Sequence, residues 1–236
     1  MGEDGKAAGG AGVSRAKVAA RAAATFLLGM AATGCILFAS AGTFAWPNAW
    51  IWLGTLAFLM TVALVALAVR EPEALARRVE YRERDKAQRR ILGAAAWYFL
   101  ALFALPGLDR RFGWSEVPPA ASLVADLAVA AAYALIVTVM LRNRWAGRTV
   151  KVVEGQKVVD TGPYAVVRHP MYAGASAFYL ATGVALGSWW AALAGLGVPV
   201  ILGVRAVAEE RTLVRELPGY LAYMEKVRWR IIPGLW

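Results

Sequence analysis

The feature that most constrains this chain is a stretch of 48 residues, 22–69, that contains no Lys, Arg, Asp or Glu. A helix that crosses the hydrocarbon core of a bilayer needs about 20 apolar residues, so this stretch is long enough for two such helices. A second uncharged run, residues 170–204, adds 35 more, and the whole 236-residue chain is 59% hydrophobic. A soluble fold would leave on the order of several hundred Å² of apolar surface uncovered. The sequence therefore predicts a multi-pass integral membrane protein.

Breaks in the hydropathy pattern divide the apolar residues into separate helices. Gly187 and Ser188 interrupt the 170–204 run near its middle, so we expect a tight helical hairpin whose second arm continues through Arg205 toward Glu210. Four earlier helices are expected at residues 22–41, 49–69, 91–105 and 120–141. The helix at 91–105 is expected to end at Pro106 and Gly107. The predicted fold class is all-α: a polytopic membrane helix bundle of about six transmembrane helices with a cytoplasmic cofactor pocket.

The basic residues follow the positive-inside rule. If the N-terminus is cytoplasmic, four of the 26 Lys and Arg lie in residues 1–21, eight in 70–90, six in 142–168 and six in 205–236, all on the cytoplasmic side. The outer loops would hold only Arg110 and Arg111. We therefore expect both termini in the cytoplasm. The net charge of +10 is then a topology signal with anionic lipid as its neighbour, and a nucleic-acid partner is not needed to explain it.

Three regions follow from this reading. Residues 1–21 are rich in Gly and Ala and are expected to be a disordered cytoplasmic N-terminus. Residues 22–141 hold transmembrane helices one to four with the charged cytoplasmic loop 70–90. Residues 142–236 are predicted to be the cofactor-binding, catalytic region, with the hairpin at 170–210 and a cytoplasmic tail.

Cysteine and histidine usage argues against a metal site. Cys35 is the only cysteine and His169 the only histidine, so no disulfide within the chain and no cysteine-based metal site can form. Cys35 lies in an apolar stretch, where we expect a small buried hydrophobic side chain. Asp126, inside an apolar helix, is expected to have a structural role.

The stretch VRHPMYAG, residues 167–174, places the single histidine at the start of the last apolar run. Pro170 suits the first position of a helix, which puts His169 at the helix N-cap. Arg168, His169 and the free N–H groups of the helix would together attract an anion at the membrane surface. An arginine that only reaches toward water and a histidine that only caps the helix are an equally good interpretation.

Two further groups of candidate functional residues follow the 167–174 stretch in the sequence. Arg205 and Glu209 are four residues apart and share a helix face, while Glu210 and Arg211 are expected on other faces. Spacing alone favours an ordinary ion pair, but ionisable groups at the hydrocarbon boundary tend to be functional. In the tail, Tyr220 and Tyr223 share a face, and residues 226–231 alternate basic and apolar side chains. The alternation predicts an extended amphipathic segment on the membrane surface. No Rossmann fingerprint, phosphate-binding loop or Ser-His-Asp set is visible.

At these three places the sequence resembles the isoprenylcysteine carboxyl methyltransferase family and its relatives, which are membrane enzymes that use S-adenosylmethionine. The matching pieces are GPYAVVRHPMYAG, the helical set of Arg205, Glu209, Glu210 and Leu213, and Y..Y..KVRWRIIPG. They cover about residues 150–236. The tail departs from the family pattern at LPG before Tyr220 and at Lys226-Val227-Arg228-Trp229, where many members have Arg-Val-Pro. Related enzymes methylate prenylcysteine carboxylates, phospholipid amines or small thiols, and some reductases of this architecture use a nicotinamide.

The resemblance implies roles for individual residues. Arg205 would face the acceptor substrate and act in catalysis together with Arg168. The cofactor-binding residues would be Lys157, Val158, Val159, Tyr164, His169, Pro170, Met171, Tyr172, Glu209, Tyr220, Tyr223 and Arg228, with Arg228 or Arg230 closing the pocket. Glu209 would bind the cofactor's ammonium or ribose hydroxyls, and His169 with the helix N-terminus its carboxylate.

The expected function is therefore methyl transfer from S-adenosylmethionine to a lipophilic or small acceptor that reaches the site from the bilayer, foremost a carboxylate of the isoprenylcysteine type. A phospholipid amine or a small thiol are alternative acceptors. An NADPH-dependent membrane reductase and a non-enzymatic membrane scaffold are alternative functions.

Overall fold

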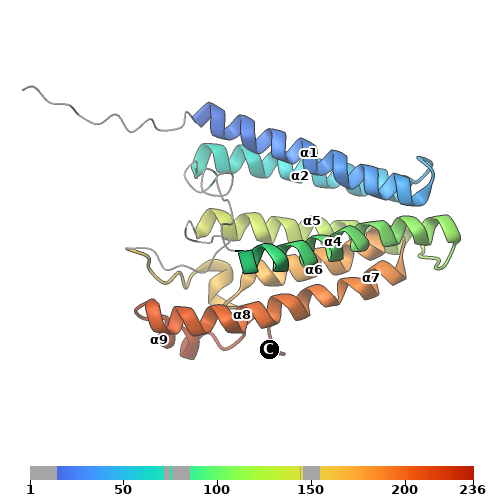
Figure 1. Ribbon diagram of the computed structural model, residues 1–236. Coiled ribbons are helices and arrows are strands. Elements are labelled where there is room, and N and C mark those ends of the chain that lie inside the picture. Colours follow the sequence, from blue (N-terminus) through green and yellow to red (C-terminus); the bar gives the residue numbers. More distant parts are fainter. Residues whose placement is uncertain (1–14, 72–74, 76–85, 144, 146–154) are drawn as a thin grey trace, which may run out of the picture.

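The computed structural model describes residues 15–71, 75, 86–143, 145 and 155–236, except for the side chains at 15–16 and 86–96. Every regular element in these residues is a helix, as the sequence predicts. Their order is α1 (Arg15–Ala41), α2 (Pro47–Arg70), α4 (Lys86–Phe112), α5 (Pro119–Arg142), the short 3-10 helix η1 (Gly162–Ala165), α6 (Pro170–Ala185), α7 (Trp189–Gly195), α8 (Gly197–Glu216) and α9 (Tyr220–Lys226). The long helices form one bundle (Figure 1).

Four helical segments in the described residues are long and apolar enough to cross a membrane. They are Lys17–Ala41, Pro47–Arg70, Pro119–Arg142 and Trp189–Glu216. Large apolar side chains point outward from these segments, for example Leu28 (72% exposed), Phe58 (69%) and Leu127 (70%). Such surfaces suit a hydrocarbon environment and support an integral membrane protein. The total of about six spans stays a prediction.

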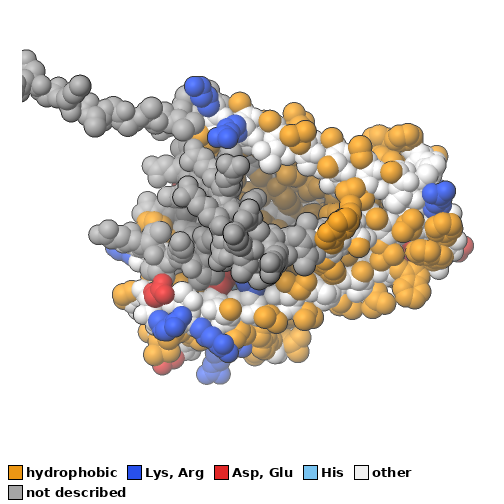
Figure 2. All heavy atoms as spheres, viewed as in Figure 1, with side chains coloured by type: hydrophobic (Ala, Val, Ile, Leu, Met, Phe, Trp, Pro, Cys, Tyr) orange, Lys and Arg blue, Asp and Glu red, His pale blue; other side chains and the backbone are white. Residues whose placement is uncertain are grey.

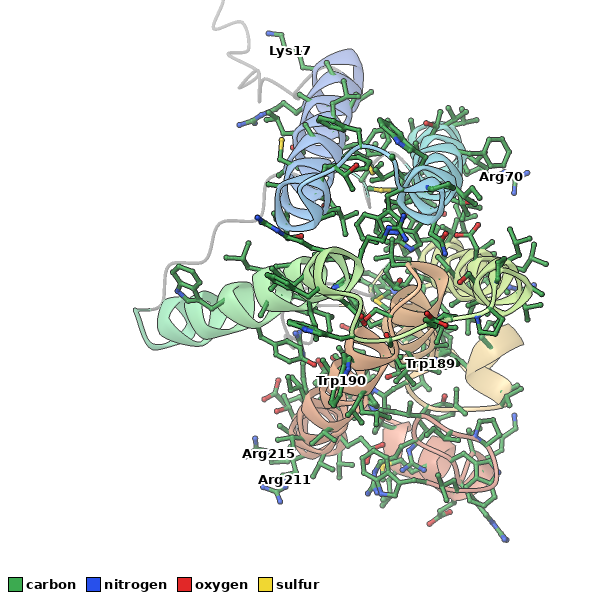
Figure 3. All side chains as sticks on the ribbon, turned by 90° about the vertical axis from the view of Figure 1, so that its right-hand side faces the viewer. Lys17, Arg70, Trp189, Trp190, Arg211 and Arg215 are labelled. Carbon is green, nitrogen blue, oxygen red and sulfur yellow. The ribbon has the colours of Figure 1, made fainter. Side chains whose placement is uncertain are left out.

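The two ends of the bundle differ in character. The start of α1 and the ends of α2 and α5 lie at one end with α9, and the turn between α6 and α7 lies at the other (Figure 1). At that second end Trp189 and Trp190 are about half exposed, as interfacial aromatic residues are. Figure 3 is viewed along the bundle from this second end. The labelled side chains of Lys17, Arg70, Arg211 and Arg215 point away from the bundle in this view. Which end faces the cytoplasm stays a prediction.

The predicted helical hairpin forms where the sequence places it. α6 ends at Ala185, Gly187 adopts φ +84°, and Ser188 begins α7 by accepting a hydrogen bond from the Ala191 amide at 3.0 Å. The positive φ explains the glycine, because other residues rarely adopt it. α7 and α8 then continue through Arg205 to Glu216 with only a short break at Leu196. The second arm of the hairpin is therefore longer than predicted.

The prediction that a helix ends at Pro106 and Gly107 is wrong, because α4 continues to Phe112. Pro106 is fully buried, and Gly107 lies so close to α1 that a Cβ atom there would collide with the Ser40 side chain. Helices buried against neighbours in a membrane tolerate proline, since the neighbours compensate for the lost hydrogen bond. Beyond it, the buried Asp109 accepts hydrogen bonds from the hydroxyls of Ser115 and Ser188, each at 2.5 Å. These bonds tie α4 to the hairpin turn.

Two further details of the first helices differ from expectation or refine it. α1 begins at Arg15, seven residues before the predicted start, and residues 1–14 and most of loop 70–90 lie outside the described residues. Cys35 is exposed on α1, so the prediction of a buried side chain is wrong. Apolar residues on a membrane helix can face lipid as readily as the core. Asp126 accepts a hydrogen bond from Thr55 at 2.6 Å, which joins α5 to α2 and suits a structural role.

Close packing of the hairpin generates a stability prediction. A Cβ atom at Gly183 would collide with the backbone of Ala192 in α7, whereas one at Gly54 on α2 would meet nothing within 4 Å. We expect Gly183→Ala to lower the free energy of unfolding by about 1–3 kcal/mol. Gly54→Ala, the matched control, should leave it unchanged or raise it by up to about 1 kcal/mol through helix propensity. Thermal unfolding of both variants in the same detergent tests this, and equal unfolding temperatures would contradict it.

Candidate active site

The loop that leads into α6 directs two side chains toward α8. Pro170 occupies the first turn of α6 and His169 is its N-cap residue, but the histidine side chain makes no capping hydrogen bond. Arg168 and His169 are instead buried, 7% and 8% exposed. The interpretation of Arg168 as a side chain that reaches toward water, and of His169 as a side chain that only caps the helix, therefore does not hold.

Glu210 on α8 is the centre of the buried charges. Glu210 is only 4% exposed. Its carboxylate accepts hydrogen bonds from Arg168 Nε at 2.7 Å and from Arg230 Nε at 2.8 Å. The His169 Nε2 atom lies 3.2 Å from the same carboxylate. Charged groups are buried only when they are paired in this way. Glu210 was expected on another helix face from Arg205 and Glu209, yet the carboxylates of both glutamates face His169, at 3.7 Å for Glu209 and 3.2 Å for Glu210.

The tail is joined to the same loop through its backbone. The Arg168 amide donates to the Trp229 carbonyl and the His169 amide to the Arg230 carbonyl, both at 2.8 Å. Arg168 Nη1 adds bonds to the carbonyls of Val227 at 2.8 Å and Arg228 at 2.7 Å. Val227 and Ile231 are buried, 3% and 2% exposed. The alternation in residues 226–231 thus packs against the protein, and α9 precedes it, which corrects the expectation of an extended surface segment.

Glu209 joins the residues of α6 and α8 that form one wall of the site. It accepts from the Tyr172 hydroxyl and from Arg205 Nε at 3.0 Å, and its Oε2 lies 3.7 Å from His169 Nδ1. His169 is therefore flanked by two carboxylates, and its ring stacks on Tyr172 with centroids 5.4 Å apart. The Arg205 guanidinium also lies near this tyrosine, 5.9 Å from the centroid of its ring, and the arginine side chain is 45% exposed. The predicted Arg205–Glu209 pair is confirmed.

α9 supplies two tyrosines to the opposite wall. Tyr220 and Tyr223 pack in an apolar cluster with Leu217 and Val227. The Tyr223 hydroxyl donates to the Tyr164 carbonyl at 2.7 Å. Burial raises the pKa of Tyr220 and Tyr223, so both hydroxyls keep their protons at neutral pH.

Outside this cluster an exposed ion pair joins the helix to the chain before η1. Lys226 Nζ donates to Asp160 at 3.0 Å, and this hydrogen bond holds the pKa of Asp160 below its usual value. Because both groups are solvent-exposed, the pair adds little to stability.

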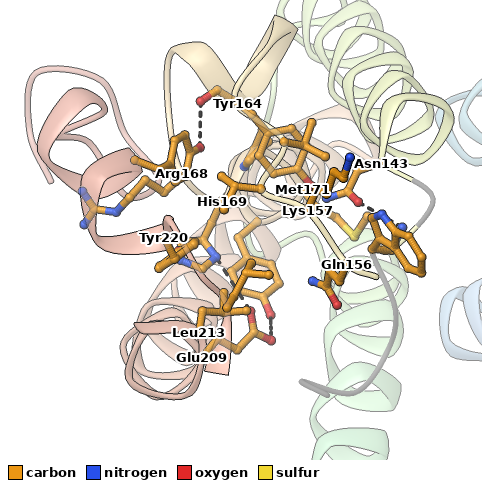
Figure 4. A pocket seen from close by; sticks show the side chains of 17 residues that line it. Asn143, Gln156, Lys157, Tyr164, Arg168, His169, Met171, Glu209, Leu213 and Tyr220 are labelled. Carbon is orange, nitrogen blue, oxygen red and sulfur yellow. Dashed lines mark hydrogen bonds and ion pairs between the residues drawn. The ribbon is translucent and has the colours of Figure 1, made fainter. Parts of the chain in front are cut away.

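These walls enclose a pocket of about 870 Å³, including its open mouth (Figure 4). That is within the range of about 300–1,000 Å³ for small-molecule sites. All but one of the residues that the resemblance implies for cofactor binding line it: Lys157, Val158, Val159, Tyr164, His169, Pro170, Met171, Tyr172, Glu209, Tyr220 and Tyr223. Arg168 lines it as well, although its guanidinium is bound to Glu210 and the tail. The structure thus brings together segments that are far apart in the sequence.

Two of the predicted residues lie outside the lining. Arg228 exposes its side chain and contributes its carbonyl to Arg168. Arg205 donates to Glu209 and lies near the ring of Tyr172, two residues that do line the pocket. The lining also includes Leu213 of the matching helical motif and four residues to which the sequence did not point, namely Asn143, Trp145, Gln156 and Leu217. Of these, Asn143 donates to the Tyr164 hydroxyl at 2.8 Å. A helix-ending Asn next to basic residues gives no signal by which it could have been found.

No group of three or more His, Cys, Asp or Glu that could hold a metal ion is found in the part of the chain that the structure describes. The polar side chains of the pocket are instead the Glu209 carboxylate, tyrosine hydroxyls, the amides of Asn143 and Gln156, and the basic groups of Lys157, Arg168 and His169. Such groups can bind an organic zwitterion, because they offer both acceptors for an ammonium and donors for a carboxylate.

Comparisons with known proteins give a family match and a fold match. Residues 121–218 match the phospholipid methyltransferase family model. The resemblance to the family of membrane methyltransferases is confirmed. Among solved structures, the fold is similar to that of a eukaryotic intramembrane Ras methyltransferase, isoprenylcysteine carboxyl methyltransferase, with a TM-score of 0.55 and 19% identity over 86% of this chain and 74% of that chain. Curated protein sequences give no match. Together the family match and the fold support a membrane methyltransferase.

The buried charges generate a second stability prediction. Glu210→Ala leaves the Arg168 guanidinium buried without its partner, so we expect the free energy of unfolding to fall by about 3–5 kcal/mol. Glu216→Ala, on the same helix but exposed, should change it by less than about 0.5 kcal/mol. Urea or thermal unfolding in detergent compares them. A loss at Glu210 no larger than that at Glu216 would show that the cluster contributes nothing to stability.

Proposed function

We propose that this chain is an S-adenosylmethionine-dependent methyltransferase that binds its cofactor in the pocket between η1, α6, α8 and α9. The observation that supports this most is convergence: residues from three separate sequence segments, each assigned to the cofactor by resemblance, line one pocket. Glu209 and His169 are in contact inside it. Had they been far apart, with no shared pocket, the assignment would have lost its support.

The side chains fit the cofactor's charged groups. Glu209 presents a carboxylate to the pocket and can accept from an ammonium or from ribose hydroxyls. The basic side chain of Lys157 lines the pocket and favours an anion, and the aromatic rings in the walls can hold a cation at their faces. When bound, the cofactor supplies a sulfonium methyl group: the acceptor's lone pair forms the new bond to the methyl carbon, and the sulfur keeps the electron pair of the bond that breaks. The protein's own contribution is alignment of the acceptor with the methyl carbon.

A second cavity supports a lipophilic acceptor. It is a hollow of about 1,490 Å³, including its opening, lined by residues of α1, α2, α4, α5 and α6. Figure 2 shows it as a recess with hydrophobic side chains on its walls. Two threonines, Thr25 and Thr33, are among its described lining residues. Each threonine hydroxyl donates to a backbone carbonyl of α1 at 2.9 Å, so its hydrogen bond is made within the helix. The hollow therefore suits a hydrocarbon chain, and a bilayer provides such chains.

α6 connects the two cavities. Tyr172 lines the pocket, and Ala175 and Tyr179, on the same helix face, line the hollow. An amphiphilic acceptor could thus place its chain in the hollow and its reactive group beside Tyr172, where the half-exposed Arg205 can bind an anionic group. A carboxylate of the isoprenylcysteine type fits this directly, because it is ionised at neutral pH and needs no base. The phospholipid methyltransferase family match favours a phospholipid amine as the second candidate.

Cofactor binding is tested by calorimetry on detergent-purified protein. We expect S-adenosylhomocysteine to bind and NADPH not to, and Glu209→Gln to weaken S-adenosylhomocysteine binding at least about tenfold by removing one charge-assisted hydrogen bond. Glu216→Gln on the exposed part of α8 is the control and should bind as the wild type does. Absence of heat with S-adenosylhomocysteine from folded wild-type protein would overturn the proposal, and binding of NADPH would favour the reductase.

Acceptor access is tested by filling the hollow. Gly29 on α1 lines it, and a Cβ atom added at Gly29 or at Gly54 would meet no other atom within 4 Å. We expect Gly29→Leu to reduce methyl transfer from a labelled donor into a membrane lipid extract at least about fivefold, because the leucine occupies the chain's place. Gly54→Leu, on the outer face of α2, should not reduce it. Equal activity of both variants would exclude the hollow from the acceptor's path.

A further inference from the structure

Residues 230–236 of the tail form a compact turn whose backbone donors are used inside it. Three consecutive amides, those of residues 230–232, donate to the Trp236 backbone oxygen at 2.9 to 3.2 Å. The amides of Leu235 and Trp236 donate back to the Ile232 carbonyl at 3.2 and 3.1 Å. In hydrocarbon each backbone polar group needs a partner within the protein, and this turn supplies one for five of its amides. Its backbone therefore suits an apolar environment.

The side chains of the turn suit the same environment. Ile231 points inward and is 2% exposed, whereas Ile232, Leu235 and Trp236 are 43%, 74% and 39% exposed. Hydrogen bonds between the ends of the turn keep these three exposed apolar side chains on one short piece of chain. An apolar group of this kind on an otherwise basic tail marks a surface that meets an apolar partner.

The turn lies against the lipid-facing surface of α8. A Cβ atom at Gly203 would be 3.2 Å from the Trp236 ring, and the C mark in Figure 1 lies beside α8. The helix neighbours of Gly203 are Val200 and Val204, which are 67% and 71% exposed and belong to the membrane-crossing segment Trp189–Glu216. The exposed apolar surface of the turn is thus continuous with a surface that already faces lipid.

The depth of this contact indicates which part of the bilayer it meets. Gly203 lies two residues before Arg205, the first charged residue after the uncharged run 170–204. The level of Gly203 on α8 is therefore where hydrocarbon gives way to headgroups, and tryptophan favours that level. We propose that the 230–236 turn is a membrane anchor, with Ile232, Leu235 and Trp236 inserted at the boundary between hydrocarbon and headgroups. Its partner is the lipid of the bilayer.

The anchor is connected to the candidate active site through Arg230. The Arg230 guanidinium lies 5.0 Å from the centroid of the Trp236 ring, and its Nε donates to Glu210 at 2.8 Å. One face of Arg230 thus contacts the anchor, while its donor reaches the buried carboxylate that faces His169. Trp236 is therefore a positioning residue for the pocket. The anchor itself goes beyond the proposed function, and only its effect on cofactor binding rests on that function.

The position of the anchor is tested with nitroxide labels on single cysteines. In a Cys35→Ser background, Leu235→Cys is labelled and reconstituted into phosphatidylcholine–phosphatidylglycerol vesicles, with Val204→Cys as the lipid-facing control and the exposed Glu216→Cys as the aqueous control. Paramagnetic resonance then compares relaxation by oxygen, which concentrates in hydrocarbon, and by a nickel chelate present on both sides of the bilayer. We expect the Leu235 label to resemble the Val204 label, with at least about threefold more relaxation by oxygen relative to nickel than the Glu216 label.

Two results would overturn the anchor. A Leu235 label that responds to nickel as the Glu216 label does would place the turn in water. A label protected from both reagents and showing spin–spin coupling between copies would mean that a second copy of the chain covers the turn. If Leu235→Cys does not fold, the half-exposed Ile232 provides the same measurement as Ile232→Cys.

The connection through Arg230 is tested by binding. Wild type, Trp236→Ala and Trp236→Phe are reconstituted in the same lipid and titrated with S-adenosylhomocysteine. We expect Trp236→Ala to lower the affinity about fivefold or more, and Trp236→Phe to stay within about twofold of the wild type, because phenylalanine keeps an aromatic face for the guanidinium.

The binding result separates the anchor from the proposed function. Equal affinities of the wild type and Trp236→Ala, or equal losses in Trp236→Ala and Trp236→Phe, would overturn the connection through the Trp236 ring and Arg230. If the folded wild type does not bind S-adenosylhomocysteine, the proposed function fails, and the nitroxide measurement still decides whether the turn is a membrane anchor.

Discussion

The arrangement of this site depends on one buried carboxylate. Glu210 binds Arg168 from the loop before α6, Arg230 from the tail and His169 at the start of α6. Burying a single carboxylate is costly, and the attraction of its partners compensates only when they are held at hydrogen-bonding distance. Every segment that carries one of these partners is therefore fixed relative to α8. Because the fixed tail follows α9, the tyrosines of the far wall take their places through the same interaction.

Association of the helices within the bilayer follows a different rule. Lipid chains are as apolar as leucine, so burial of apolar surface contributes little there and close contact contributes more. Gly107 against α1, Gly174 against α5 and Gly183 against α7 each allow a neighbouring helix to approach where a methyl group would not fit. Polar contacts such as Thr55 with Asp126 add direction to this packing. The rigid bundle supports the more polar site at one end, where loops and tail would otherwise lack a platform.

The sequence predicted the parts of this structure that depend on local pattern. Uncharged length identified the membrane helices, Gly187 and Ser188 marked the hairpin, and Pro170 marked the start of α6. The continuation of α4 past Pro106 could not be predicted, because it depends on burial against α1 and on Asp109 reaching Ser188. The position of Cys35 was missed for a related reason, since a lipid-facing residue and a core residue are both apolar.

Prediction of the site divides in the same way. The segments that line the pocket were recognised by their motifs, and the Arg205–Glu209 pair by its spacing of four. The role of Glu210 was missed because helical spacing places it on a face different from that of Arg205, and nothing in the sequence says that His169 inserts between the two neighbouring glutamates. Asn143 was missed because its contact with Tyr164 joins residues 21 apart across a loop. Contacts between segments, rather than patterns within one, decide these cases.

The location of the site at the end of the bundle has a physical reason in the proposed function. A charged nucleotide cofactor cannot enter hydrocarbon, and the chain of a lipid acceptor has no favourable place in water, so the two can meet only at the boundary. α6 joins the two cavities, with Tyr172 at the pocket and Ala175 and Tyr179 at the hollow. Glu209 holds Arg205 beside Tyr172, and the arginine side chain is 45% exposed, so under the proposed function an anionic acceptor group could approach it. A group that binds Arg205 must share it with Glu209, and this competition would tie acceptor binding to the carboxylate that also faces the cofactor.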